Sequence, residues 1–444
     1  MTRAPDRTGT PAVRRWYRFS VLALLTALVV SVGFVAHYGV RAVAFPYALD
    51  YGEGPLLEQA MRLADGVGIY RQVGAEQWTV SNYPPLYPLL NSALPTVFGP
   101  AYWYGRAVSL LSAAGAGLFA GLIVRTITRD RLAAWATGLL IPAIPYVGVW
   151  SGLARIDLLA LMLSLAGLWC AIRWPRSNGA LVAAVALLAA AVYTRQTYLL
   201  AAPLTAFVWI LGTSRRRAAV FAGSLAAVVL VVGLLLNGFT GGGFWFNVVT
   251  ANVNQFDLSV LASFGLDVLT HLPVLVELIV VYVVVAVKTR PRSARVVLPY
   301  LSAAIVVGLT AGKIGSGPNY LLEFSVACSL AAGALLAWLR AQPRWHPVTM
   351  ALLTVQALTL RCSPTRTTNW FPNGWTMPPP NNSSSGWWTV PPVPSSPMRR
   401  WACSRWSAGR FNSNPSNSVS SHGPGVGTKT RSSRPSVSAA TPQS

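Results

Sequence analysis

The chain has 444 residues, of which 53% are hydrophobic and only 11% are charged. Soluble domains carry about 25% charged residues, so this composition excludes an ordinary soluble protein. The net charge is +23, but many arginines stand in short runs between long apolar blocks. This pattern favours cytoplasmic loops near anionic lipid over a nucleic-acid interface. The four cysteines show no metal-ligand spacing.

In chain order, the apolar blocks predict an all-α membrane protein with about eleven spans, because a helix of about 20 apolar residues crosses a bilayer. The first block follows Arg14, Arg15 and Arg18 and is expected to be a retained span rather than a cleaved signal peptide. The spans are expected at 17–37, 103–124, 132–150, 156–172, 178–194, 197–212, 218–237, 268–287, 296–312, 319–339 and 346–360.

One more apolar segment, 84–99, is rich in proline, which opposes a regular spanning helix. If this segment does not cross, the N-terminal arginines and five later basic clusters all lie in the cytoplasm. If it crosses, all five later clusters lie outside, against the positive-inside rule. We therefore expect 84–99 to lie on the surface or to be re-entrant. The five clusters are Arg125/Arg129/Arg131, Arg173/Arg176, Arg215/Arg216/Arg217, Lys288/Arg290/Arg292/Arg295 and Arg340/Arg344.

This topology divides the chain into three parts. Residues 1–16 form a cytoplasmic tail, and residues 17–360 form the transmembrane domain. That domain has a long semi-apolar first outer loop, 38–102, with an amphipathic stretch from Pro55 to Ala64, and a second outer loop, 238–267. Residues 361–444 lack Leu, Ile, Tyr, Asp and Glu and cannot build a core. A disordered tail and an out-of-frame product are both open interpretations of this last part.

The acidic residues are unevenly distributed over this topology. Of the twelve, Asp6 and Asp130 are cytoplasmic and Glu277 falls inside a span, which leaves nine toward the outer side. Because acids are so scarce, their concentration on one side predicts a functional site there. The nine are Asp50, Glu53, Glu58, Asp65, Glu76, Asp157, Asp257, Asp267 and Glu323.

Three outer segments carry the strongest chemical signals. Asp50 and Glu53 lie in a Gly-rich turn, where a carboxylate can take a proton from an attacking hydroxyl; a solvated turn at a helix start is the alternative. Tyr83 opens a proline-rich stretch that suits an interfacial wall, or only a turn before a helix. Arg155 and Asp157 stand at the outer mouth between two spans, as a functional pair or as a structural salt bridge.

Cations on the outer side oppose the positive-inside trend and need a reason. Arg195 precedes Gln196, and Lys313 is followed by a Gly-rich segment and Asn319. Such cations can hold a phosphate, or they can snorkel to the outer headgroups. Together with the acids, they predict a site for a substrate with a phosphate head and a lipid tail.

These residues resemble the GT-C superfamily of membrane glycosyltransferases over roughly residues 15–345. The acidic motif of the first outer loop is matched by Asp50 and Glu53, the proline-rich segment by Tyr83-Pro84-Pro85-Leu86, and a later Arg/Asp element by Arg155 and Asp157. The span layout is similar to that of protein O-mannosyltransferases. The loop motifs resemble those of lipid-A aminoarabinose transferases and lipopolysaccharide-core galacturonosyltransferases.

The resemblance implies a GT-C-like fold in the cell membrane and the transfer of a sugar from a polyprenyl-phosphate donor to an extracytoplasmic acceptor. It implies Asp50 as the base, with Glu53 and Asp157 in support, and Arg195 and Lys313 as phosphate ligands. Arg155, Gln196, Asn319 and Tyr83 complete the expected substrate-binding set. Metal dependence varies in the superfamily, so a divalent metal is an open option and no other cofactor is implied.

Two other classes of function, a transporter or flippase and a membrane scaffold, are alternatives to the transferase. A transporter or flippase of a lipid-linked or anionic solute should place charged residues at the midplane and often shows repeated halves. Only Glu277 falls deep in a span, and no repeat is evident. A membrane scaffold has little need for clustered outer acids. The sequence therefore favours a transferase whose partners are a lipid-linked donor, membrane lipids and an outer acceptor, without nucleic acid.

Overall fold

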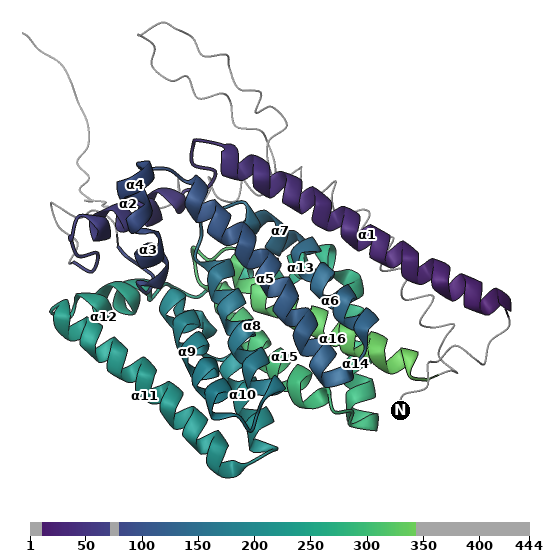
Figure 1. The fold of residues 1–444 in the computed structure, drawn as a ribbon. Helices are drawn as coiled ribbons and strands as arrows, with labels where there is room; N and C mark the ends of the chain where they lie inside the picture. The colour runs from purple at the N-terminus through teal and green to yellow at the C-terminus, as the bar shows by residue number, and fades with distance from the viewer. Residues whose placement is uncertain (1–10, 72–79, 343–444) are drawn as a thin grey trace, which may run out of the picture. The chain divides into compact units, whose positions relative to one another are not determined.

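A computed structural model describes residues 11–71 and 80–342, and this part of the chain is all-α (Figure 1). The predicted span 346–360 and the tail 361–444 lie outside the described residues. Apart from an isolated β-bridge between Phe256 and Lys313, the described residues contain only helices, turns and loops. The all-α prediction is confirmed for this part of the chain.

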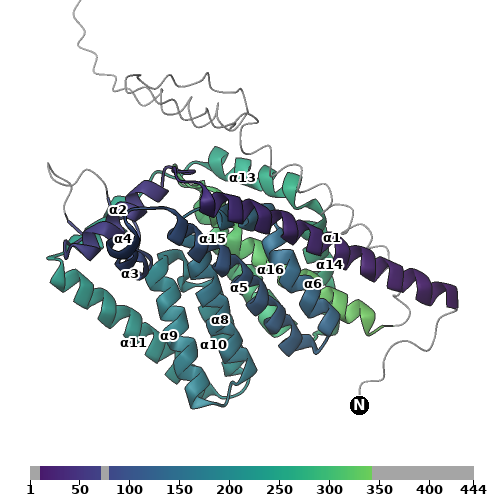
Figure 2. The ribbon, with the colours of Figure 1, turned by 45° about the horizontal axis from the view of Figure 1, so that its top comes forward.

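The first helix, α1 (Pro11–Ala44), is longer than the predicted span 17–37. The irregular segment after it therefore starts at residue 45, while the boundary of the first outer loop at residue 38 stays a prediction. The amphipathic stretch forms α2 (Glu53–Ala64), close to its predicted bounds. Figures 1 and 2 show α1 along one edge of the helix bundle, with α2 near its C-terminal end.

The proline-rich segment 84–99 folds into two six-residue helices, α3 (Leu86–Asn91) and α4 (Ala93–Phe98). Six helical residues rise only about 9 Å, far less than the hydrocarbon thickness. Neither helix therefore spans, as the proline content predicts. With α2, these helices form a group at one end of the bundle (Figure 2).

The central helices pack closely against one another. They are α5 (Trp103–Thr128), α6 (Arg131–Ala143), α7 (Pro145–Ser151), α8 (Asp157–Arg173), α9 (Asn178–Thr194), η1 (Gln196–Leu199) and α10 (Ala201–Leu211). The predicted span 132–150 is broken by 61° between α6 and α7, next to Pro145. Proline is favoured at the first position of a helix, so a new helix can begin at Pro145.

The remaining described helices continue the bundle. They are α11 (Arg215–Phe239), α12 (Gly243–Val248), η2 (Thr250–Asn252), α13 (Leu258–His271), α14 (Pro273–Thr289), α15 (Ala294–Leu309), η3 (Thr310–Gly312), η4 (Pro318–Leu321) and α16 (Leu322–Arg340). A 92° bend separates α13 from α14, so the predicted span 268–287 starts only at Pro273 and the predicted loop 238–267 is largely helical. Glu277 lies within α14, on a face that other described residues do not cover, so its predicted position inside a span is retained.

Ten of the eleven predicted spans coincide with helices in the described residues. Among those residues, five helices are long and apolar enough to cross a membrane, or seven if each bent pair is one span. Such helices are those of a multi-pass membrane protein. The count of eleven spans stays a prediction.

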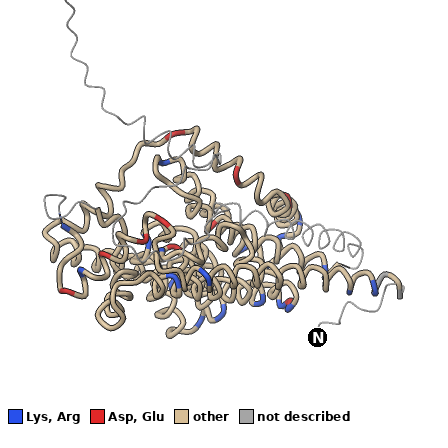
Figure 3. The backbone as a smooth tube through the Cα atoms, turned by 90° about the horizontal axis from the view of Figure 1, so that it is seen from above, with Lys and Arg blue, Asp and Glu red and all other residues tan. Residues whose placement is uncertain are grey.

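Basic and acidic residues gather at opposite ends of several helices. Basic residues end α5, α8, α14 and α16, whereas acids begin α2, α8 and α16. In Figure 3, blue segments lie on the long helix beside the N label and along the lower edge of the view, several red segments lie along the upper edge, and both colours meet near the centre. This separation matches the predicted cytoplasmic and outer sides, although the assignment of each end to a side of the membrane stays a prediction.

Candidate active site

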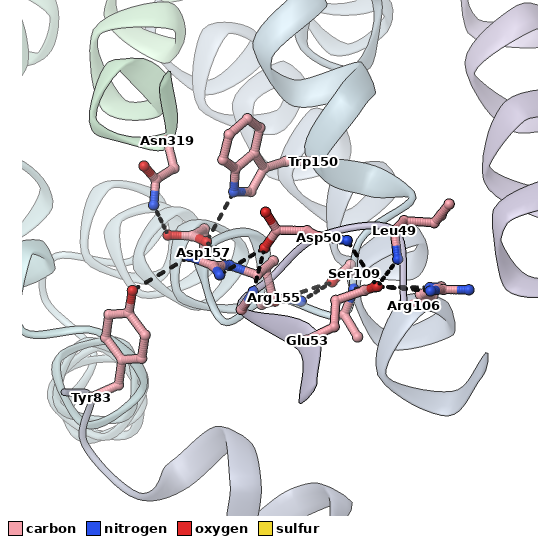
Figure 4. A network of polar contacts seen from close by, with 12 residues as sticks. Leu49, Asp50, Glu53, Tyr83, Arg106, Ser109, Trp150, Arg155, Asp157 and Asn319 are labelled. Atoms are coloured by element: carbon pink, nitrogen blue, oxygen red, sulfur yellow. Dashed lines mark hydrogen bonds and ion pairs between the residues drawn. The ribbon is translucent and has the colours of Figure 1, made fainter. Parts of the chain in front are cut away.

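Five segments that are distant in sequence meet beside α2 and carry a connected polar network (Figure 4). They are the turn before α2, the start of α3, the α7–α8 loop, the α9–η1 junction and η4. Each lies at the end of a helix, where backbone groups have no partner within the helix and can bind groups of other segments. The network therefore depends on how the whole bundle brings helix ends together.

Asp50 is the partly exposed acid of this network. Its Oδ2 accepts hydrogen bonds from Arg155 Nη1 at 2.9 Å and from the Gly52 amide at 3.0 Å. Its side chain is 24% exposed. Its other carboxylate oxygen has no hydrogen-bond partner among the described residues. Asp50 is thus held in place by one oxygen and has the other available for a substrate hydroxyl.

Glu53 is fully buried, although it lies only three residues from Asp50. Arg106 donates to both of its carboxylate oxygens, from Nε at 2.8 Å and from Nη2 at 2.7 Å. The amides of Leu49 and Ala154 donate at 2.6 and 2.7 Å. Burial alone would raise the pKa of Glu53, but these hydrogen bonds outweigh it and the pKa lies below its ordinary value. Glu53 is therefore an ionised anchor.

Arg106 on α5 is the buried partner that the sequence analysis missed. Besides Glu53, its guanidinium donates to three backbone carbonyls at the end of α1 and just after it: those of Ala42, Phe45 and Tyr47, at 2.8, 2.6 and 2.6 Å. These bonds use all five N–H donors of the side chain. The available signal was an arginine at the outer end of the predicted span 103–124, where the positive-inside rule does not expect one.

Arg155 connects the exposed and buried acids. Besides Asp50, its guanidinium contacts the Tyr83 hydroxyl at 3.4 Å, and its Nε lies 3.8 Å from Asp157 Oδ2. The guanidinium also lies over the ring of Tyr51, 5.8 Å from its centroid. Arg155 is buried, and Nε has no hydrogen-bond partner within the described part of the chain. It can therefore orient Asp50 and still donate one further hydrogen bond.

Asp157 is fully buried at the start of α8, where the helix dipole favours a carboxylate. Arg195 and Asn319 donate to its Oδ1, the latter at 3.0 Å. Trp150 Nε1 donates to Oδ2 at 3.1 Å. Arg195 in turn lies over the ring of Tyr320. Asp157 therefore holds two arginines, one on each side.

Two predicted substrate ligands lie outside this network. Gln196 donates to the Asn82 carbonyl at 3.2 Å rather than to an acid. Lys313 pairs through its backbone with Phe256, and it forms no ion pair with any acid in the described residues. The structure thus joins Asp50, Glu53, Tyr83, Arg155, Asp157, Arg195 and Asn319, with Arg106 and Trp150 as additions.

The acids of this site do not fit a bound metal ion. Within residues 11–71 and 80–342, no three His, Cys, Asp or Glu side chains converge. Asp50 and Asp157 are already paired with Arg155 and Arg195, whose positive charges oppose a cation. We derive no catalytic step through a metal.

Comparison with solved structures defines the class of fold. In sequence, no family model matches the chain, and no curated protein matches it. In structure, the chain shares the fold of ArnT and of the archaeal oligosaccharyltransferase AglB, so the expected resemblance is confirmed for the fold.

Two particular GT-C proteins illustrate the match. ArnT from Cupriavidus metallidurans, solved in the apo state and bound to undecaprenyl phosphate, gives a TM-score of 0.54 in both states. In the apo state it is 15% identical, over 76% of this chain and 75% of that one. The archaeal oligosaccharyltransferase AglB from Archaeoglobus fulgidus, in complex with an inhibitory peptide and a dolichol-phosphate, gives a TM-score of 0.50 at 11% identity. The match covers 78% of this chain but only 56% of AglB.

Proposed function

We propose that this protein is a membrane glycosyltransferase that moves a sugar from a polyprenyl-phosphate donor to an extracytoplasmic acceptor, which is a glycan, a lipid or a protein. The proposal rests on Asp50: Arg155 orients its side chain, and one of its carboxylate oxygens is open. The same network contains two further buried arginines, Arg106 and Arg195. The fold supports the same class, because ArnT and AglB are GT-C proteins solved with undecaprenyl phosphate and dolichol-phosphate.

In the proposed reaction, Asp50 accepts the proton of an acceptor hydroxyl as the hydroxyl oxygen bonds to the anomeric carbon of the donor sugar. The bond from that carbon to the phosphate oxygen breaks, and its electron pair leaves with the polyprenyl phosphate. Negative charge therefore grows on the phosphate. Arg195 supplies positive charge that stabilises it, and Lys313, which the sequence predicts on the same face, stays a second candidate phosphate ligand.

The other acids have positioning roles in this proposal. Glu53 and Arg106 fix the turn that carries Asp50, because their hydrogen bonds join it to α5 and the end of α1. Asp157 fixes Arg155 and Arg195 relative to one another. Tyr83 and Asn319 close the network from either side (Figure 4).

The test is sugar transfer by Asp50→Asn in membranes supplied with a polyprenyl-phosphate sugar. The amide keeps the shape of the side chain but cannot accept the proton, so we expect a loss of about 100-fold or more at unchanged expression. Asp65→Asn, an exposed acid at the end of α2, is the matched control and should retain activity. Full transfer by Asp50→Asn would refute the role of Asp50 as base.

A further inference from the structure

Glu323 differs from every other acid near the site. It lies in the first turn of α16, is 3% exposed, and neither of its carboxylate oxygens has a hydrogen-bond partner in the described residues. Asp50, Glu53 and Asp157 each accept hydrogen bonds from an arginine. A buried carboxylate without donors is strongly disfavoured in its charged form. The proposed reaction so far gives Glu323 no role.

The charges of the site balance without Glu323. Three arginines pair with three acids: Arg106 with Glu53, Arg155 with Asp50 and Arg195 with Asp157. Glu323 is a fourth acid with no cation of its own. An ionised Glu323 would leave this buried cluster with an excess negative charge, whereas a protonated Glu323 leaves it neutral.

Glu323 is nevertheless placed to act on the site. Asn319, which holds Asp157, lies in η4, directly before α16. Arg195, the cation on Asp157, lies over the ring of Tyr320, three residues before Glu323. Tyr198 of η1 donates to the Asp157 backbone carbonyl at 3.2 Å, and the Tyr300 hydroxyl on α15 is buried without a partner among the described residues.

Other ionisable groups on the helices that pack against α16 are engaged elsewhere or lie at the basic ends. Tyr146 on α7 donates to Asp267, and Tyr282 on α14 donates to Ser293. On α5, Arg106 is used by Glu53. Arg125 on α5, Arg131 on α6 and Lys288 on α14 lie at the helix ends away from the acidic first turns. Arg195 is thus the cation for which Glu323 and Asp157 compete.

We propose that Glu323 is a proton-holding positioning residue for Arg195. While Glu323 is protonated, Arg195 stays on Asp157 and its positive charge is available to an incoming phosphate. When Glu323 ionises, its negative charge offsets the positive charge of Arg195 and repels the phosphate. This inference rests on the proposed function, because it assumes that the site binds a lipid-linked phosphate.

The consequence is a linkage between phosphate binding and protonation. A ligand anion favours the protonated form of Glu323, so the site should bind it best at low pH. As pH rises and Glu323 ionises, affinity should fall. The expected change is about ten-fold or more, as for one unit charge added near the anion at an effective dielectric constant of about 20.

The experiment measures binding of the methyl ester of undecaprenyl phosphate to the full chain in nanodiscs at about pH 6 and about pH 9. This diester keeps one negative charge throughout, whereas a phosphomonoester would itself titrate near about pH 6. Wild type and Glu58→Gln, which removes a partly exposed acid paired with Arg62 on α2, should lose affinity at the higher pH. Glu323→Gln should bind at both pH values as tightly as wild type does at the lower one, and Glu323→Asp should restore the pH dependence.

Equal pH dependence in wild type and Glu323→Gln would overturn the inference, as would its absence from wild type. Absence of binding in every variant at both pH values would instead refute the proposed function, and this inference with it. Thermal unfolding supplies a second measurement: the melting temperature of wild type should fall more between the two pH values than that of Glu323→Gln. Equal falls in both proteins would count against the inference.

Discussion

At the scale of single residues, two carboxylates separated by three positions have opposite surroundings. Asp50 and Glu53 belong to one turn, in which the Glu53 amide donates to the Asp50 carbonyl at 3.1 Å. The turn directs Glu53 toward Arg106 in the interior and Asp50 toward Arg155 at the margin. Saturated hydrogen bonds make Glu53 an anchor, whereas Asp50 keeps an open oxygen, as its proposed role as base requires.

Gly52 makes this divergence possible. A Cβ atom at Gly52 would overlap Arg155 Nη1, whereas at Gly54 its nearest neighbour is the Tyr102 hydroxyl at 3.9 Å. Gly52→Ala should therefore displace Arg155 from Asp50 and lower transfer activity by about 100-fold, as expected for a shift of about 1 Å at a catalytic group.

Gly54→Ala is the matched control in the same transfer assay, with expression and melting temperature recorded for both variants. It should lose at most a few-fold in activity. Similar losses of activity in both variants would show that the turn needs glycine for its backbone conformation, rather than Gly52 for the close approach of Arg155.

At the scale of helices, the site depends on close packing between α5 and α6. A Cβ at Gly117 would come within 2.5 Å of the Gly138 carbonyl, and one at Gly121 within 2.8 Å of the Ala134 carbonyl. Gly117 and Gly121 thus form a small-residue face that lets two backbones touch, as is common between membrane helices. Since α6 leads into α7, which carries Trp150, this contact also determines where Asp157 is held.

Gly121→Val tests that contact. The added side chain must separate the helices, and overpacking of this kind costs about 1–3 kcal/mol. The measurement is the melting temperature in detergent, compared with Gly223→Val on α11, where a Cβ meets nothing within 4 Å. Both variants undergo the same Gly-to-Val change in helix propensity, so equal shifts in melting temperature would contradict the packing argument.

At the scale of the whole molecule, opposite ends of the helices carry different chemistry. The acidic end holds the arginine–carboxylate network around Asp50 and Asp157. The other end holds most of the basic clusters, and there Arg340 on α16 donates to both oxygens of Asp130 at 2.6 and 2.7 Å and to the Tyr17 hydroxyl on α1. Helix ends are thus tied together at both ends of the bundle.

This asymmetry predicts the orientation in the membrane. In a chain whose native cysteines are replaced, Leu90→Cys should react with an impermeant thiol reagent applied to intact cells, because α3 belongs to the acidic end. Thr213→Cys, exposed beside the basic start of α11, should react only after permeabilisation. The reverse pattern would place the candidate active site in the cytoplasm and contradict the proposed extracytoplasmic acceptor.

Much of the fold was predictable from sequence because its signals are local. Apolar blocks of span length predicted ten helices of the described part, and the prolines of 84–99 predicted a segment that does not cross. The acidic turn and the Arg155–Asp157 element were found in the same way. The bend before Pro273 and the extension of α1 to Ala44 were missed, because hydropathy alone does not report where an apolar helix turns or continues.

The sequence by itself determined that the chain is a helical membrane protein with scarce acids gathered toward one end. Only the tertiary structure decided that Asp50 keeps an open carboxylate oxygen, whereas both carboxylate oxygens of Glu53 are hydrogen-bonded and buried. Arg106 reaches Glu53 across 53 positions, and Arg155 reaches Asp50 across 105. Within the described residues, it also left Lys313 without an ion pair and the Glu323 carboxylate without a hydrogen-bond partner. Hydropathy is a property of neighbouring residues, whereas the partner and the solvent access of a carboxylate depend on helices that meet only in the folded bundle.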